Sequence, residues 1–254
     1  MPEIAAASTG ELLRELHVRI AGHFENVAQA RSRLNPAAPV FALEHDMTKG
    51  DLESLMIAVR AGVLEGLDSR HRKSWLPFVV YATEAGYSYE GDEYWQSFEE
   101  LTPGWRLEHR RWMREQFERF AADFGGFIPT GAFATHFKNI AWPTTHCVMP
   151  KYLQRQMAQL LYDFRSGLTS QLLENPDELG QRLYARSGAF SERFTKFCSN
   201  TALVGHVASA LLSHDDEPTP YLTTPTLKRV VDGLSEERDA RRWLQSARRS
   251  AVAA

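Results

Sequence analysis

The stretch ELLRELHVRIAGHFENVAQARSRLNP, residues 11–36, decides the fold class. Ser8 or Thr9 is expected to cap a helix here, with Glu11 in its first turn. Asn35 and Pro36 are expected to end it, because proline lacks the amide donor that a helix needs. The apolar residues between these limits recur every three or four positions, on one face of a helix: Leu13, Leu16, Ile20, Phe24 and Val27.

The same period continues along the rest of the chain. Thr48 and Asp51 resemble a capping box with Asp in place of the usual Glu. The apolar run from Trp75 to Ala82 could be a buried strand, but Gly86 after Thr-Glu-Ala favours a helix that stops there. Ser235 is expected to cap the last helix. Helices are predicted at 48–67, 74–85, 92–101, 105–124, 150–172, 176–187, 189–199, 201–213, 225–234 and 236–249, with two short pieces in the proline-broken segment 127–150.

These helices, joined by short proline or glycine turns, predict an all-α fold. Short connections imply antiparallel neighbours, so we expect an irregular antiparallel helical array, with a HEAT-like α-solenoid as one form of it. The stretch 214–220 is acidic, contains two prolines and lacks an apolar anchor. It predicts a linker between a main helical domain, 1–213, and a C-terminal helical pair with a basic tail, 221–254.

Composition excludes several classes of protein. A net charge of −3 argues against a wholly basic nucleic-acid binder. The N-terminal residues lack the pattern of a signal peptide, and no run approaches the roughly 18 apolar residues that cross a bilayer. Two cysteines, Cys147 and Cys198, are too few for a disulfide framework and fit reduced thiols. We therefore expect a cytoplasmic protein without a membrane partner.

Histidines and cysteines gather around the proline-broken segment. His136, His146 and Cys147 could converge with Cys198 on zinc, which takes nitrogen and sulfur ligands. Their spacing matches no zinc finger or helix-based metal pair, so histidines bonded to turn carbonyls and buried thiols are the favoured interpretation. No P-loop, G-x-S-x-G or H-E-x-x-H motif is present. Neither a metal nor a cofactor is assigned, and no residue is assigned a catalytic role.

An acidic and aromatic segment spans residues 84–100, with six carboxylates and no lysine or arginine. Tyrosine and tryptophan are enriched where proteins bind one another, so this segment is the candidate protein-binding site. The alternative is that its rings pack inward while its acids are solvated. The residues assigned to binding are Tyr87, Tyr89, Asp92, Glu93, Tyr94 and Trp95.

The C-terminal region carries a local excess of positive charge. Such a cluster is typical of phosphate contact, and it is the candidate nucleic-acid site. The alternative is that these arginines interact with helix dipoles and keep the surface soluble. The arginine-rich helix at 105–124 is interpreted instead as a salt-bridged face, because acids stand four positions from its arginines. The residues assigned to nucleic acid are Lys228, Arg229, Arg238, Arg241 and Arg242.

Three stretches carry a resemblance to other proteins. They are LPFVVYATEAGYSYEGDEYWQSFEELTPGW (76–105), FGGFIPTGAFATHFKNIAWPTTHCVMPKYLQRQMAQLLYDFR (124–165) and TLKRVVDGLSEERDARRWLQSAR (226–248). Together they resemble the amino-terminal helical region of larger, uncharacterised bacterial proteins from mobile-element and phage-defence loci, over residues 70–250. The resemblance implies a fragment or one component of a multi-protein system. It carries over no functional residue.

These observations leave three functional hypotheses. The first is a non-catalytic helical scaffold that binds another protein through residues 84–100. The second is a nucleic-acid-binding module that uses the basic C-terminal helices. The third is an enzyme with an unrecognised site near His136 and His146.

Overall fold

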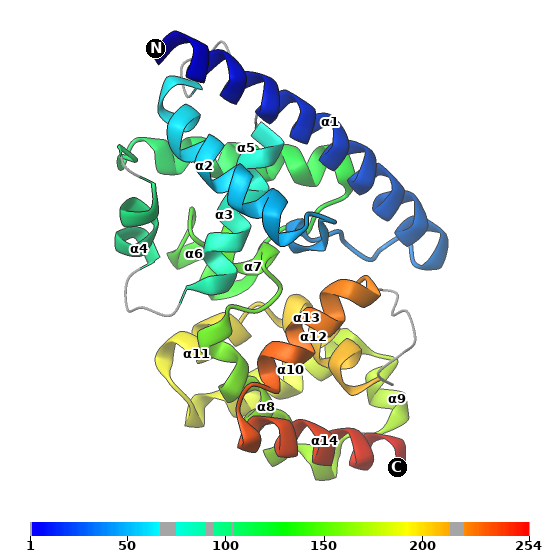
Figure 1. The fold of residues 1–254 in the computed structure, drawn as a ribbon. Helices are drawn as coiled ribbons and strands as arrows, with labels where there is room; N and C mark the ends of the chain where they lie inside the picture. Colours follow the sequence, from blue (N-terminus) through cyan, green and yellow to red (C-terminus); the bar gives the residue numbers. More distant parts are fainter. Residues whose placement is uncertain (1, 67–74, 90–93, 103, 214–220, 254) are drawn as a thin grey trace. The chain divides into compact units, whose positions relative to one another are not determined.

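The computed structural model describes residues 2–66, 75–89, 94–102, 104–213 and 221–253 (Figure 1). Within these ranges the chain forms α-helices, turns and short 3-10 segments, with no β-strand; an isolated bridge joins Val40 and Gly126. The predicted all-α class is confirmed. No helix in the described ranges combines the length and the hydropathy needed to cross a membrane.

The chain divides into two compact units, Met1–Ile128 and Pro129–Ala254. The expected linker, 214–220, lies outside the described residues. Residues 221–253, expected to form a separate helical pair, belong to the second unit together with 129–213. There α13 (Thr224–Leu234) and α14 (Arg238–Ala253) both pack against α8 (Lys151–Asp163).

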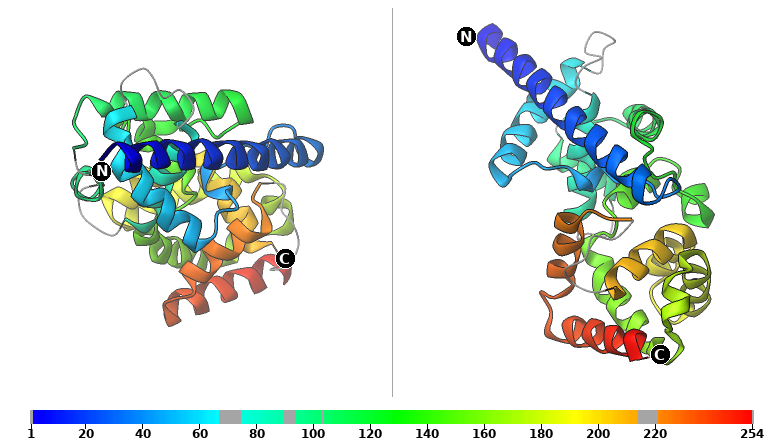
Figure 2. Two further views of the ribbon diagram at one scale, coloured as in Figure 1. Left: turned by 45° about the horizontal axis from the view of Figure 1, so that its top comes forward. Right: turned by 90° about the vertical axis from the view of Figure 1, so that its right-hand side faces the viewer.

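The first unit is built around one long helix, α1 (Pro2–Leu34), which packs along α2 (Lys49–Gly66) and α3 (Trp75–Ser88) (Figure 2). Its predicted end before Asn35 is confirmed. Its expected cap at Ser8 or Thr9 is wrong, because the helix already begins at Pro2. Proline is compatible with a first helical turn, and the alanines at positions 5–7 have the highest helix propensity.

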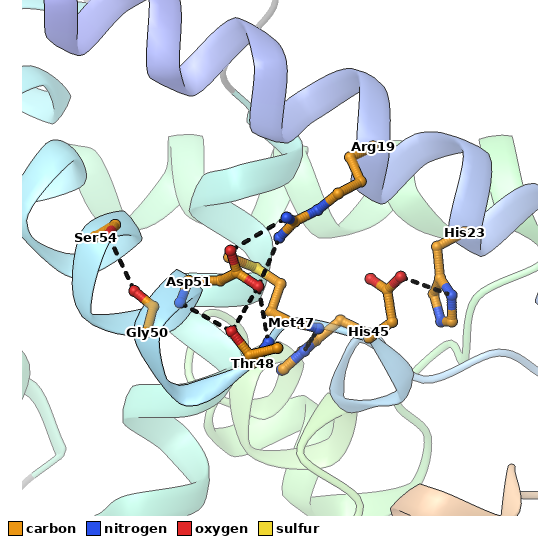
Figure 3. Close-up of polar contacts among 9 residues, drawn as sticks. Arg19, His23, His45, Met47, Thr48, Gly50, Asp51 and Ser54 are labelled. Carbon is orange, nitrogen blue, oxygen red and sulfur yellow. Dashed lines mark hydrogen bonds and ion pairs between the residues drawn. The ribbon is translucent and has the colours of Figure 1, made fainter.

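The predicted capping box at the start of α2 is confirmed (Figure 3). The Asp51 amide donates to Thr48 Oγ1 at 3.2 Å, and the Thr48 amide donates back to the Asp51 carboxylate at 2.9 Å. Arg19 of α1 reaches the same carboxylate, with Nη1 and Nη2 within 3.1 Å of its oxygens. The Arg19 hydrogen bond, followed by those from Thr48, lowers the pKa of Asp51 from 3.8 to about 2.

Two helix boundaries in the first unit differ from the prediction. Helix α3 passes through Gly86 and ends at Ser88, because Gly86 is buried and does not adopt the left-handed conformation of a helix stop. Helix α5 (His109–Phe124) starts at His109, not at Trp105. The His109 Nδ1 atom accepts a hydrogen bond from the Arg106 amide at 3.0 Å, in the turn that precedes the helix. The predicted stop at Gly125 is confirmed, with φ of 67°.

A buried ion pair connects α1 to the loop that follows it. Arg31 Nη2 lies 2.5 Å from Glu44 Oε1, and both side chains are at most 5% exposed. The other Glu44 carboxylate oxygen accepts a hydrogen bond from the Phe41 amide at 2.9 Å, and Arg31 also donates a hydrogen bond to the Pro39 carbonyl at 2.7 Å. Because both charges are paired and further hydrogen-bonded, the loop is held against α1 without an unsatisfied buried charge.

The second unit consists mainly of short helices. Segment 127–150 contains the two short pieces that were expected, here α6 and α7. The predicted end of α8 near residue 172 is wrong, because the helix stops at Asp163 and a 3-10 segment follows, Arg165–Gly167. Ser235 is the C-cap of α13, not the N-cap of α14. The remaining helices are α6 (Gly131–His136), α7 (Ala141–His146), α9 (Ser170–Leu173), α10 (Pro176–Arg186), α11 (Glu192–Cys198) and α12 (Thr201–Leu212).

Helices α10 and α12 approach each other closely at two glycines. A Cβ added to Gly205 would overlap the carbonyl oxygen of Pro176, and one added to Gly180 would overlap that of Thr201. The backbones therefore touch at both positions, where only glycine fits. This contact fixes the packing of the second unit.

Because α10 and α12 approach so closely, adding a single methyl group at their contact is predicted to lower the stability of the fold strongly. We expect Gly205→Ala to lower the free energy of unfolding by about 3 kcal/mol, because the new Cβ must displace backbone atoms of α10. Gly188→Ala is the matched control: nothing lies within 4 Å of its added Cβ, so its effect should stay within about 0.5 kcal/mol. Urea denaturation measures both, and equal effects would contradict the proposed contact.

The capping box predicts a pH-dependent loss of stability. We expect Asp51→Ala to cost about 1 kcal/mol at pH 7, because the hydrogen bond that the carboxylate accepts from the Thr48 amide and the Arg19 contact disappear, while the amide of residue 51 can still donate to Thr48 Oγ1. Since folding lowers this pKa from 3.8 to about 2, the contribution is fully present above pH 3.8 and is lost as the pH falls toward 2. Urea denaturation between pH 2 and 7 should show the gap between wild type and variant closing in that window. Glu53→Ala, on the exposed side of α2, is the control; a gap independent of pH would exclude the carboxylate charge as its source.

Candidate protein-interaction site

Hydroxyl groups tie α4 (Tyr94–Leu101) to α3. The Tyr81 hydroxyl of α3 donates to the Leu101 carbonyl at 3.1 Å and lies 2.7 Å from Thr102 Oγ1. In return, the Tyr94 hydroxyl of α4 makes a long contact of 3.5 Å with the Ala82 carbonyl. These contacts hold both ends of α4 against α3.

Helix α5 and the turn before it hold the other side of α4. The Arg110 guanidinium lies over the Trp95 ring at 4.2 Å, and its Nη2 atom is 2.9 Å from Glu99 Oε1. The Trp105 ring packs edge-on against Phe98 at 5.0 Å. Cation–π and ring contacts of this kind each stabilise the folded state by about 1 kcal/mol. Helix α4 is therefore held from two directions.

A pocket of about 320 Å³ opens between α3 and α4. This volume is at the small end of ligand sites, which range over about 300–1,000 Å³. The Tyr89 and Tyr94 rings meet edge to face at 5.7 Å in its wall. The pocket is lined by Ala85, Ser88 and Tyr89 around the end of α3, and by Tyr94, Ser97, Phe98, Glu100 and Leu101 of α4.

Glu100 is the one carboxylate in this lining, and none of the eight described lining residues is basic. It is exposed, and its Oε1 atom accepts a hydrogen bond from Gln96 at 3.2 Å. Its neighbour Glu99 is neutralised by Arg110. The described part of the lining thus combines aromatic walls, two serine hydroxyls and one negative charge.

The structure places the predicted protein-binding residues in three groups. Asp92 and Glu93 lie outside the described residues. Tyr87, Tyr89 and Tyr94 are buried, at most 7% exposed, and Trp95 is half-buried beneath Arg110. The tyrosine rings thus pack inward, as in the alternative interpretation. Tyr89 and Tyr94 nevertheless line the pocket, so contact with a partner stays a prediction for these two.

Sequence reasoning missed the small and acidic residues of the pocket. Ala85 and Ser88 stand three positions apart, and Ser97 and Leu101 stand four apart, so each pair shares one helix face. Small residues on facing helix surfaces leave space between them. The spacing of Ala85 and Ser88 on one helix and of Ser97 on the next is therefore the sequence signal for this pocket.

The basic C-terminal residues have two different environments. Arg241 donates to the Ser235 carbonyl at 2.7 Å, and Arg248 donates to the Leu211 carbonyl at 2.7 Å. Both therefore satisfy carbonyl groups at helix C-termini. The exposed side of α14 instead carries Arg238, Arg242 and Arg249, spaced by four and seven residues on one helix face. Of the two predicted residues on α13, Lys228 is exposed and Arg229 is half-buried.

The segment around the histidines and cysteines is a packed interior. Residues 141–150 are buried throughout, His146 is completely buried, and His136 is exposed. Burial raises the pKa of the Cys198 thiol to about 12, so this thiol is protonated at neutral pH. Among the described residues, no group of three or more His, Cys, Asp or Glu side chains is arranged to hold a metal ion.

A strained turn follows α7 in this interior. Val148 has a φ of 66°, a conformation that β-branched residues rarely adopt, and the Met149 amide donates to the Cys147 carbonyl at 2.7 Å. The Cys147 Sγ atom donates to the Thr144 carbonyl at 2.9 Å. Dense packing holds this strained turn in place.

Comparisons with models of known protein families, with curated proteins and with solved structures find no match to this chain. Two surfaces of the chain are candidates for binding a partner. The first is the α3–α4 pocket of the first unit. The second is the arginine face of α14, defined by Arg238, Arg242 and Arg249.

Proposed function

We propose that the chain is a non-catalytic helical scaffold that binds another protein through the α3–α4 pocket. The observation that carries this proposal is a preformed pocket, with tyrosine walls and a carboxylate, in the segment where sequence composition also favours a protein partner. The resemblance of residues 70–250 to uncharacterised bacterial proteins from mobile-element and phage-defence loci supports a role as one component of a bacterial phage-defence system in the cytoplasm. A HEAT-like stacking of helix pairs belongs to the same proposal.

The hydrogen bonds and burial of two cysteines and one histidine outside the pocket support a structural role for these side chains. Cys147 donates to a backbone carbonyl, and burial keeps the Cys198 thiol protonated. The His45 ring bridges Glu84 at 2.7 Å and the Met47 amide at 3.2 Å, so both of its nitrogens have a structural partner. Each of these bonds holds neighbouring segments of the chain together, which is the structural role that the proposal assigns to these groups.

The pocket can be tested by filling it. We expect Ser97→Phe to reduce capture of the partner at least tenfold when the tagged chain is co-expressed with the products of its neighbouring genes, because the added ring occupies the cavity. Ser97→Ala keeps the cavity open and is the matched control. Circular dichroism melting of both variants checks that the helices persist. If Ser97→Phe and wild type capture the partner equally well, the interface does not lie at this pocket.

A second candidate function is nucleic-acid binding through the arginine face of α14. Three exposed arginines on one helix face suit a row of phosphates, and among the described residues only Arg242 has an acidic neighbour, Asp239 at 3.8 Å. The opposite side of α14 is buried, so this face is fixed in orientation. Arg241 is less suitable than predicted, because its guanidinium is bonded to the Ser235 carbonyl.

The arginine face predicts salt-sensitive DNA binding. We expect the double variant Arg238→Ala, Arg242→Ala to weaken binding of a 20-base-pair duplex about tenfold at 50 mM salt, since two phosphate contacts are lost. The control is Arg111→Ala with Arg119→Ala, which removes the same charge from the salt-bridged face of α5. Fluorescence anisotropy measures both. Failure of the wild-type chain to bind at low salt, or equal loss in the two double variants, would remove this candidate.

A further inference from the structure

The chemistry of the α3–α4 pocket identifies the kind of group that it takes. Building on the proposed function, we propose that the pocket receives one cationic side chain, arginine or lysine, from a partner polypeptide. Three features of the lining favour this occupant. They are the negative charge of the lining, the aromatic rings in the wall of the pocket and the serine hydroxyl groups.

The charge of the pocket is negative. Glu100 lines it, no described lining residue is basic, and the nearby Arg110 is already paired with Glu99 at 2.9 Å. Arg110 also lies over Trp95 at 4.2 Å, and neither of these two residues belongs to the described lining. No described residue of the lining therefore balances the negative charge of Glu100, and a cation gains from it directly.

The walls suit a cation that carries an apolar stem. Tyr89 and Tyr94 present aromatic carbon, and the face of an aromatic ring attracts a cation. Phe98, Leu101 and Ala85 supply aliphatic and aromatic surface for the methylene groups of a long side chain. The Ser88 and Ser97 hydroxyls can accept the remaining N–H donors of a guanidinium or ammonium group.

Other occupants fit this lining less well. A purely apolar side chain would shield Glu100 from water without supplying an opposite charge, which costs free energy. An acidic side chain would meet like charge. A basic side chain on a polypeptide matches both the apolar walls and the carboxylate, and the small volume, about 320 Å³, suits one side chain better than a larger ligand.

A panel of short peptides tests this inference on the whole chain. The probes are capped pentapeptides of sequence Gly-Ser-X-Ser-Gly, with X as arginine, lysine, citrulline, leucine or glutamate. Citrulline has nearly the shape of arginine without its charge, so it is the matched ligand control. Binding is followed by the NMR shifts of the Ser97 and Leu101 amides, both in α4. We expect the arginine and lysine peptides to bind with dissociation constants on the order of 1 mM, as one partly exposed contact gives.

Two variants separate charge from shape. Glu100→Gln should weaken the arginine peptide about two- to fivefold, the range for an exposed ion pair. Glu53→Gln removes the same charge from the exposed side of α2 and should leave the affinity unchanged. Raising salt from 50 to 500 mM should weaken the arginine peptide but not the citrulline peptide.

The possible results lead to different conclusions. If leucine or citrulline binds as well as arginine, or if Glu100→Gln changes nothing, the cationic occupant is wrong while docking at the pocket stands. If no peptide shifts the α4 amides at 10 mM, the inference is overturned. Docking itself is then decided by the independent Ser97→Phe capture experiment.

Discussion

Helix α4 has eight residues, fewer than the ~12–15 that an isolated helix needs in water, so its position depends on the contacts that hold it. Phe98 anchors it among aromatic rings of α3 and the following turn. The Tyr81 hydroxyl fixes its C-terminal end, and Arg110 fixes its outer face. The pocket between α3 and α4 exists only while these anchors hold, which makes a short helix the element on which the candidate site depends.

Much of the fold could be predicted because its signals are local. The apolar period of α1, the Thr48 and Asp51 capping box and the left-handed Gly125 each depend on residues within a few positions of one another. The errors arose where tertiary contacts decide. Gly86 stays helical because it is buried in α3. Helix α8 ends early although Leu168 and Leu172 continue its apolar period; Leu168 is buried from the extended residue that follows the 3-10 segment, and Leu172 is buried from α9.

The candidate site could be predicted only in its location along the chain. Composition identified the segment 84–100, but tyrosine side chains occur both in protein cores and at interfaces, so composition does not distinguish the two. Periodicity says which face of a helix is apolar, and it does not say which element covers that face. Thus Tyr87 and Tyr94 could not be recognised as buried, nor could Ser97 and Glu100 be recognised as lining residues, without the packing of α3 against α4.

The charged side chains fall into two groups, those that stabilise the fold and those that are available to a partner. Glu44 is bound to Arg31 inside the first unit, and Arg248 satisfies a carbonyl at the end of α12, so removing either charge would leave a buried group without its bond. Glu100, Arg238 and Arg249 have no ion pair within the described residues, and they lie at the pocket and on α14. A charged partner gains most at such positions, because no ion pair among the described residues has to break first. Opposite charges at the pocket and on α14 therefore favour different partners: a basic side chain at the first, and phosphates at the second.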